Sequence, residues 1–592
     1  MKFDNIKQLA LVAFVGLAFT SCEKYLDKPS EDSYTTDNYY QTEAQCLGAT
    51  TYLYNSPWYD FQRGFIKIGE VLSGNYFWGS SPYLQFTVNG TDEDLVNMSA
   101  SLWAAIGHSN TVYELLKGSP VSQELKASAM GECLLWKAMG YFFLVRTFGE
   151  VPIVHSNNEM LKSGDYSSVQ KVKRADVFEY IIMTLEKAIE LLPETASQPG
   201  RLDKWSAKGL LAKVYLTKSG LSGTVNKDDL ANAAKYAKDV IDNSGKKLEK
   251  NYEDIFLLSN RYTEEGLIAW RWTAEGTNWT RQNSYQSDLA ISGIDDWGAT
   301  WGGWNGFSVD LQEAFGVKLL EQDPTVWKGL QEYPRLHATM MLPGFTYKQF
   351  WQDKPHDKNN GFDYIKFIYE NSTTGSLESA TGSNTVKHIY GDTYDHEQGA
   401  GCSDGRMASS VPTFLLRLSD VYLIYAEAIC GGRGSSTTDA AAIDAFYAVR
   451  SRGQQHPDAK PNSISWDDIW KERRLEFAME GDRWYDYVRT SYYDPDFCIN
   501  ELQGQKRNQF WGLNDLYETY HEKGTWTVDP SKMMYNTSVP APNVTNLMKK
   551  DPDSGKMYFL LPPTADDVLS NPNLATDVDG VHVDIRATYS YE

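Results

Sequence analysis

Residues 466–489, WDDIWKERRLEFAMEGDRWYDYVR, combine aromatic side chains with closely spaced charges in one helix-forming run. Ser465, followed three residues later by Asp468, is typical of a helix N-cap with a capping box. Gly481 offers a C-terminal stop, because glycine readily ends a helix. The stretch therefore predicts one helix that begins after Ser465 and ends near Gly481, with a second helix following it.

The acidic residues of this run could be mistaken for an acid–base site. Glu472, Glu476 and Glu480 recur every four residues, which places them on one helical face. They would repel one another unless cations pair with them, and arginine forms bidentate bonds to carboxylates. Arg473, Arg474 and Arg483, which lie in the same stretch, can supply these cations. We interpret these charges as a structural ion-pair network rather than a catalytic site.

The segment KERRLEFAMEGDRWYDYVR resembles the ER-x-x-E-x-x-x-EG-x-RW-x-D-x-x-R signature of the SusD/RagB-like outer-membrane nutrient-binding lipoproteins. Three more segments resemble that family, in its order: GECLLWKAMGYFFLVRTFGEVPIV at 131–154, LRLSDVYLIYAEAI at 416–429 and YFLLPPTADDVLSNPNL at 558–574. The chain departs from the pattern at Trp136, where Arg or Leu is usual, and at LPPT, which replaces the commoner P-I-P. The resemblance implies a mainly α fold, with a tetratricopeptide-repeat-like helical scaffold, long loops and a few short strands.

Composition limits the partners of this 592-residue chain. Its net charge of -22 disfavours polyanions, so we expect no nucleic-acid ligand. The chain contains 18 tryptophans and 37 tyrosines, a surplus that needs either core to fill or surface to bind.

The first residues are typical of an exported protein. Lys2 and Lys7 precede an apolar run at 9–19, which suits a signal peptide and is too short to span a bilayer. Cys22 then follows small residues, as in a lipoprotein signal. We predict a signal peptide at 1–21 and an acylated Cys22; the alternative is an ordinary signal peptide with a free cysteine.

Apolar residues at helical spacing indicate the scaffold. Phe178, Ile181, Ile182 and Leu185 begin one stripe, which Pro193 ends, and similar stripes follow at 207–215, 230–241 and 418–429. We divide the mature chain into an N-terminal region with tetratricopeptide-like helices at 22–245 and a region with ligand loops and C-terminal helices at 246–592. A short strand is expected at 364–369.

Two aromatic loops are the candidate ligand surface. Residues 66–90 carry glycines and Pro82 with Tyr76, Trp78 and Tyr83. Residues 277–310 are too rich in glycine for a stable helix and carry Asp295, Asp296, Trp297, Trp301 and Trp304. We predict that the six aromatic rings form a platform for sugar rings and that Asp296, with Asp295 beside it, accepts hydrogen bonds from hydroxyls.

No enzyme motif appears among those sought: HExxH, the GxSxG elbow and a dinucleotide fingerprint. A group with possible metal ligands, His388, Asp392, Asp395 and His396, has no zinc-finger or helical spacing, so we interpret it as a surface loop. We expect no metal, cofactor or catalytic residue.

The resemblance implies a surface-exposed, lipid-anchored outer-membrane protein that binds nutrient glycans and hands them to a SusC-type TonB-dependent transporter. A secreted glycoside hydrolase is one alternative. Such an enzyme needs only two suitably placed carboxylates, and the sequence does not show which of its 78 acidic residues lie close together. A scaffold that binds only proteins is the other.

Overall fold

The computed structural model describes residues 39–591, apart from 166, 275–278, 355–360, 406 and 455. The predicted signal peptide and Cys22 lie outside these residues. Helices dominate the described chain, and its strands are two to five residues long. The prediction of a mainly α fold with a few short strands is therefore confirmed. In the part of the chain that is described, no helix is long and apolar enough to cross a membrane.

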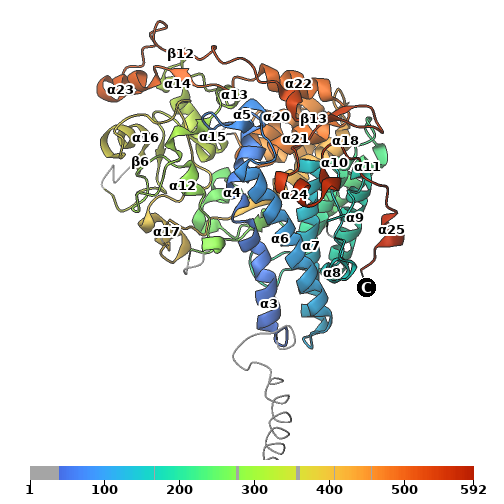
Figure 1. The fold of residues 1–592 in the computed structure, drawn as a ribbon. Coiled ribbons are helices and arrows are strands. Elements are labelled where there is room, and N and C mark those ends of the chain that lie inside the picture. The colour runs from blue at the N-terminus through green and yellow to red at the C-terminus, as the bar shows by residue number, and fades with distance from the viewer. Residues whose placement is uncertain are drawn as a thin grey trace, which may run out of the picture.

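The scaffold is a row of long helices in which each packs against the next (Figure 1). Its members are α6 (Glu93–Lys117), α7 (Gln123–Phe148), α9 (Arg174–Leu191), α10 (Lys204–Lys218), α11 (Lys227–Asn243), α18 (Leu418–Cys430) and α19 (Ala440–Arg452). The chain between α11 and α18 leaves this row and returns, since these two helices are direct neighbours. The likeness to tetratricopeptide repeats stays an interpretation.

The predicted stripe on α9 faces the core. Phe178, Ile181, Ile182 and Leu185 are at most 1% exposed. The helix ends at Leu191, two residues before the proline that the sequence offered as its stop. Packing of this stripe against α7 and α10 supplies the hydrophobic stabilisation that a solvent-exposed helix lacks.

The segment between α11 and α18 holds short elements separated by loops. They include β2 (Gly266–Trp270), α12 (Tyr285–Leu289), β3 (Gly306–Phe307), α13 (Val309–Ala314), α14 (Pro324–Lys328), α15 (Pro334–Thr339), β4 (Met340–Met341), β5 (Thr346–Tyr347), β6 (Phe362–Asp363), α16 (Tyr364–Lys366), β7 (Asn384–Thr385), α17 (Thr393–Ala400) and β8 (Thr413–Arg417). The strand expected at 364–369 is wrong: these residues are helical, because Asp363 caps the turn by accepting from the Lys366 N–H at 3.0 Å.

In the described part of the chain, the named strands form two-stranded antiparallel sheets. β2 pairs with β8, which leads directly into α18 and so ties the segment to the helical row. The N-terminal strand β1 (Tyr76–Phe77) pairs with β3 across more than two hundred residues of sequence. These two strand pairs fix the positions of the loops that adjoin the paired strands.

The charged signature begins as the sequence predicts. α20 (Trp466–Glu476) has Ser465 as its N-cap, with both hydrogen bonds of the capping box to Asp468. The predicted end near Gly481 is wrong, because α20 already stops at Glu476. Met479 and Gly481 both adopt the left-handed conformation, with φ of 66° and 72°, which a continuing α-helix does not allow. The second helix, α21 (Arg483–Ser491), follows as predicted.

The ion-pair network exists, but its arginines come from elsewhere. Glu472, Glu476 and Glu480 pair with none of the arginines of their own stretch. They pair with Arg335 of α15, Arg417 of β8, Arg452 of α19 and Lys387. The arginines that the sequence offered as partners pair instead with four aspartates and one glutamate. Arg473, Arg474 and Arg483 contact Asp310, Asp420, Asp482, Asp486 and Glu501. The charged side chains of α20 and of residues 477–483, which follow it, thus form ion pairs with segments that are distant in the sequence.

Three further short elements lie between those already given, namely α8 (Asn157–Ser163), β9 (Ser436–Thr437) and β10 (Ile464–Ser465). Others precede α6 or follow α21 in the described chain. On the N-terminal side these are α3 (Glu43–Thr51), α4 (Phe61–Ile66), the π-helical turn η3 (Lys67–Val71) and α5 (Pro82–Gln85). On the C-terminal side they are α22 (Pro495–Gly504), β11 (Phe510–Trp511), α23 (Leu513–Lys523), β12 (Met534–Tyr535), β13 (Met548–Lys550), β14 (Met557–Phe559), α24 (Ala565–Ser570) and α25 (Ile585–Thr588).

Candidate functional site

The loop that follows α12 carries three exposed tryptophans. Trp297, Trp301 and Trp304 have exposed fractions of 52%, 53% and 65%. Leaving such large apolar rings in water forgoes the stabilisation that burial would give. Exposed apolar groups that gather in one segment mark a binding surface more often than chance. The prediction that these rings lie on a loop is confirmed, with Trp304 in a single 3-10 turn, η7 (Gly302–Trp304).

Glycines let this loop lie close against the body of the protein. A Cβ atom at Gly302 would collide with the backbone of Asp288, and one at Gly303 would collide with the Glu378 side chain. Gly306 is equally tight against its neighbours. Because a larger residue at these positions would force the loop outward, the glycines hold its inner side in place while the tryptophan rings stay exposed.

The β1–β3 pair brings the first aromatic segment next to the second. Phe77 lies opposite Gly306 in antiparallel register. Trp78 directly follows Phe77, and Trp304 precedes Gly306 by two residues. Both tryptophans therefore leave the same end of the strand pair. Trp78 is half-buried, so it presents only part of its ring.

A half-exposed arginine lies beside Trp301. The Trp301 indole donates its Nε1–H to Asp288 Oδ1 at 3.0 Å. The Nε atom of Arg63, whose side chain is 46% exposed, lies 3.9 Å from Asp288 Oδ2 and 3.8 Å from Asp94 Oδ1. Burial raises the pKa of Asp288, while the Trp301 bond and the Arg63 charge oppose that rise. The guanidinium of Arg63 thus keeps donors free for a ligand hydroxyl, since its two carboxylate contacts are long.

Lys67 continues this row of charges to Trp78. It bonds to Asp94, and its ammonium lies 5.1 Å from the centre of the Trp78 ring, within cation–π range. No motif in the sequence marks Arg63, Lys67 or Asp288. We define the tryptophan surface as Trp78, Trp297, Trp301 and Trp304 together with Arg63.

Two of the predicted platform residues belong to the core. Tyr76 and Tyr83 are both fully buried, so neither can offer a ring face to a sugar. Tyr76 packs edge-on against Phe307 of the paired strand, and Tyr83 donates its hydroxyl to Asp92 at 2.5 Å. Their inclusion in the platform was wrong, because the segment at 66–90 is folded into η3, β1 and α5 rather than into one open loop.

The two aspartates beside Trp297 differ. Asp295 is 8% exposed and accepts from the backbone N–H of Ala299 at 3.2 Å, so it shapes the loop rather than facing a ligand. Asp296 has a 45% exposed side chain and pairs with Lys354 at 3.0 Å. It keeps acceptor capacity for a ligand.

Trp297 is steadied by its indole N–H, which donates to Asp404 at 3.3 Å. The same carboxylate oxygen accepts from the Tyr390 hydroxyl at 2.9 Å. Burial raises the pKa of Asp404, and the bonds from Tyr390 and Trp297 act in the opposite direction. The bond to Asp404 thus ties Trp297 to a segment other than the strand pair that places Trp304.

The group considered as a cation site is buried and bonded within the protein. His388, Asp392, Asp395 and His396 are at most 7% exposed, so their interpretation as a surface loop is wrong. Asp392 and Asp395 form the capping box of α17, and both histidines bond to backbone carbonyls. Among the residues that the structure describes, no three potential metal ligands gather.

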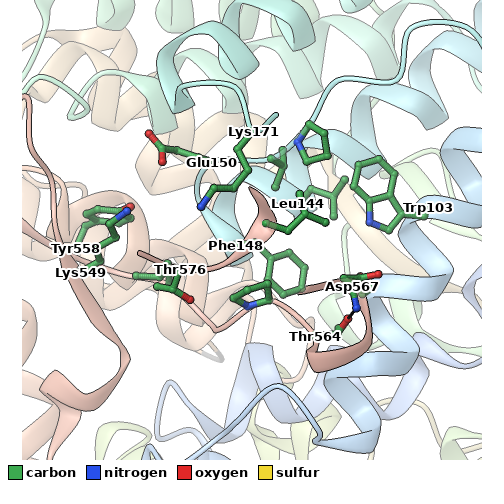
Figure 2. A pocket seen from close by; sticks show the side chains of 16 residues that line it. Trp103, Leu144, Phe148, Glu150, Lys171, Lys549, Tyr558, Thr564, Asp567 and Thr576 are labelled. Atoms are coloured by element: carbon green, nitrogen blue, oxygen red, sulfur yellow. Dashed lines mark hydrogen bonds between the residues drawn. The ribbon is translucent and has the colours of Figure 1, made fainter. Parts of the chain in front are cut away.

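The pocket in Figure 2 lies between the scaffold and the C-terminal segment. It is lined by Trp103 of α6, Phe148 of α7, Tyr558 of β14 and Asp567 of α24, among others. Its volume of about 40 Å³ holds a few water molecules but no sugar ring. None of the predicted ligand residues lines it. The exposed tryptophans therefore remain the candidate ligand site.

The fold and this surface define a helical protein that presents aromatic rings beside charged groups. The chain belongs to the SusD family: the family model of that description matches residues 261–576. A second model, described as starch-binding and associating with the outer membrane, matches residues 24–216.

Similar proteins span most of the chain. A SusD-like protein of Bacteroides ovatus is 33% identical over 519 residues, 86% of each chain. A solved structure of a protein with a xylogluco-oligosaccharide has 28% identity and a TM-score of 0.72, covering 91% of this chain and 99% of that one. A laminarin-binding SusD-like protein, at 21% identity and a TM-score of 0.58, shares the fold.

Proposed function

We propose that this protein binds a nutrient oligosaccharide or polysaccharide at the cell surface, with the tryptophan surface as its binding site and without cleaving the glycan. The observation that carries this proposal is the exposure of Trp297, Trp301 and Trp304. Their loop packs closely against the rest of the protein because its glycines lack side chains. Flat indole rings stack on the apolar faces of sugars, while Arg63 and Asp296 offer a donor and an acceptor for hydroxyls. The protein of similar fold whose structure was solved with a xylogluco-oligosaccharide supports the same ligand class.

Electrophoresis through gels that contain a polysaccharide tests this proposal, combined with an assay for new reducing ends. Xyloglucan is the first polysaccharide to try, and a glycan array extends the search. We expect retarded migration in one such gel with no new reducing ends. New reducing ends would instead support the glycoside hydrolase. A blank array and blank gels, with a protein partner that co-purifies, would support a scaffold that binds only proteins.

We further propose that Cys22 is acylated and anchors the mature protein to the outer membrane. The match to a model described as associating with the outer membrane supports this location. The Cys22→Ala variant should appear in the soluble fraction after cell lysis. A variant that still sediments with outer membranes, in cells that lack any partner transporter, contradicts the anchor.

The last part of the proposal is a transporter partner. Captured glycan benefits the cell only when a pore stands beside the binding protein, and the described chain has no helix that could span a membrane. We propose a SusC-type TonB-dependent transporter, held through an interface on the order of 2,000 Å² or more, as expected of a permanent complex. Purification in mild detergent should yield the two proteins together, and a lone protein from membranes that contain the transporter contradicts the partnership.

A further inference from the structure

A further cavity, of about 530 Å³, lies beside the helical row. It is bounded by the loop after α9, the start of α10, the residues that follow α11 and the segment that leads into β2. The helix α10 packs against both α9 and α11 (Figure 1). The volume falls in the range of about 300–1,000 Å³ that is usual for sites of small ligands. None of the tryptophan-surface residues lines this cavity.

The three basic residues of the lining differ in their partners. Arg201 pairs with Glu132 at 3.0 Å, and Lys246 pairs with Asp203 at 2.8 Å. The third, Arg271, forms no ion pair with a carboxylate within the described chain. Arg271 is therefore the cation of this lining that keeps binding capacity.

The position of Arg271 is fixed, and part of its guanidinium is accessible. Its backbone N–H donates to the Tyr54 carbonyl at 2.7 Å, and its own carbonyl accepts from the Asn55 amide at 3.0 Å. Its Nη1 donates to the Arg261 carbonyl. Its Nη2 makes no hydrogen bond within the described chain and, unlike Nε, is not one of the buried atoms that lack a partner. Nη2 therefore offers two accessible N–H donors.

The charge of Arg271 is only partly compensated. The side chain is half-buried, and burial lowers the pKa of its guanidinium to about 10. The influences that oppose this fall come from Tyr262 and Tyr54 rather than from a carboxylate. The group stays protonated at neutral pH, and hydrogen bonds to charged groups are stronger than those between neutral groups. An acceptor at Nη2 would therefore be favourable.

An exposed aromatic ring lies next to this guanidinium. Tyr262 is 51% exposed, and the Arg271 guanidinium lies 5.6 Å from the centre of its ring. Gly200 lets the loop after α9 approach both side chains, because a Cβ there would lie 3.0 Å from Arg271 Nε and 3.0 Å from the Tyr262 ring. Gly200 also has a φ of 84°, which favours glycine. The loop thus packs beside a ring and a donor that lie together.

The rest of the lining is polar and balanced in charge. Glu264 is exposed, and its carboxylate has no partner within the described chain, so it can accept hydrogen bonds. Hydroxyl groups of Thr195, Ser197 and Ser244 also line the cavity. Three acidic residues face three basic ones, namely Glu194, Asp203, Glu264, Arg201, Lys246 and Arg271. Equal numbers of the two charges favour a neutral polar ligand over an ion.

We propose that this cavity is a second carbohydrate site, which binds a small neutral sugar. One face of the sugar stacks on Tyr262, one hydroxyl accepts from Nη2 of Arg271, and another hydroxyl donates to Glu264. A sugar fits this set of groups because it combines an apolar face with hydroxyls that both donate and accept hydrogen bonds. The site is separate from the tryptophan surface and does not depend on it.

Saturation-transfer NMR on the full mature chain tests this site, since the method detects weak binding of small sugars. The probes are glucose, galactose, mannose and xylose. The protein is compared with a variant in which Trp297, Trp301 and Trp304 are replaced by alanine. We expect transfer to at least one sugar, retained in the tryptophan variant. No transfer to any of the four overturns the proposal, and so does transfer that is lost in the tryptophan variant, because that result assigns binding to the tryptophan surface.

Matched tyrosine variants locate the binding, in the wild-type background and in the tryptophan variant. Tyr262→Ala removes the ring of the site, and Tyr394→Ala removes a 40% exposed ring that does not line the cavity. Both rings are largely exposed, so both variants should melt close to their parent proteins. We expect Tyr262→Ala to abolish the saturation transfer and Tyr394→Ala to preserve it. Equal signals from the two variants overturn the proposal.

A glutamate pair tests the acceptor without removing a ring. Glu264→Gln keeps the shape of the side chain and removes its charge, and Glu124→Gln does the same at an exposed glutamate of α7 that does not line the cavity. We expect roughly threefold to tenfold weaker binding of the active sugar by Glu264→Gln alone, as for loss of one hydrogen bond. Unchanged affinity in both variants overturns the proposed geometry. Failure of the tryptophan surface to bind glycan would leave these results intact.

Discussion

The interior around Arg417 and the surface around Trp301 both reverse the usual placement of side chains. Arg417 is 1% exposed and pairs with Glu265 at 2.6 Å, Glu476 at 3.0 Å and Glu480 at 2.6 Å. Trp301 is 53% exposed. Charged groups usually face water and large apolar rings usually face the core. Ion pairing offsets the free energy needed to bury the Arg417 charge. The free protein has no comparable contact that offsets the exposure of the Trp301 ring to water. The contrast distinguishes residues that stabilise the fold from residues that are exposed for ligand binding.

The largest expected effect comes from breaking the interior. Arg417→Ala leaves three buried carboxylates with too few cations, and removal of one partner from a buried charge cluster costs about 3–5 kcal/mol. We therefore expect a large fall in the urea midpoint of unfolding. Arg433→Ala is the control, because Arg433 is 43% exposed and pairs only at the surface, with Asp494 at 2.9 Å. Equal midpoints for the two variants would show that the buried cluster contributes no more than a surface ion pair.

The second effect is the dependence of stability on pH. Burial alone raises the pKa of the Glu476 carboxyl, but the charges of Arg452, Arg335 and Arg417 outweigh burial and hold the pKa well below its usual 4.5. Because the pKa is lower in the folded than in the unfolded state, this stabilisation is complete above pH 4.5 and is lost as the pH falls further. Melting temperatures should therefore fall more steeply below pH 4.5 in the wild type than in Glu476→Gln. Parallel curves contradict the assignment.

The smallest effect is expected on the surface. Arg63→Ala removes one donor from beside Trp301, and a single hydrogen bond to a ligand contributes roughly threefold to tenfold in affinity. Arg433→Ala again serves as the control, since its exposure is close to the 46% of Arg63. Isothermal titration with the glycan that the array identifies should show weaker binding for Arg63→Ala alone. Identical affinities place Arg63 outside the site.

Local patterns in the sequence predicted the helices better than the contacts between them. The apolar spacing of α9 and the capping box at Ser465 depend only on neighbours in the chain, and both are confirmed. The partners of the carboxylates of the α20 segment were missed, since Arg417 and Glu476, for example, are 59 residues apart in the sequence. The helix end was misplaced because Met479, which carries a Cβ, adopts a left-handed conformation that its type does not predict.

The same limit applies to the candidate site. Glycine content identified the loop of Trp297, Trp301 and Trp304, because a glycine-rich segment cannot form a stable helix. It could not show that Tyr76 and Tyr83 are buried, since an aromatic ring is equally at home in a core and in a binding surface. That distinction depends on the β1–β3 pairing, which joins distant segments.

The most direct test of the account replaces Trp297, Trp301 and Trp304 by alanine in one variant. These rings are more than half exposed, so the variant should melt close to the wild-type temperature. It should no longer be retarded in a gel of the polysaccharide that retards the wild type. Normal folding with unchanged retardation would contradict the claim that the tryptophan surface binds glycan.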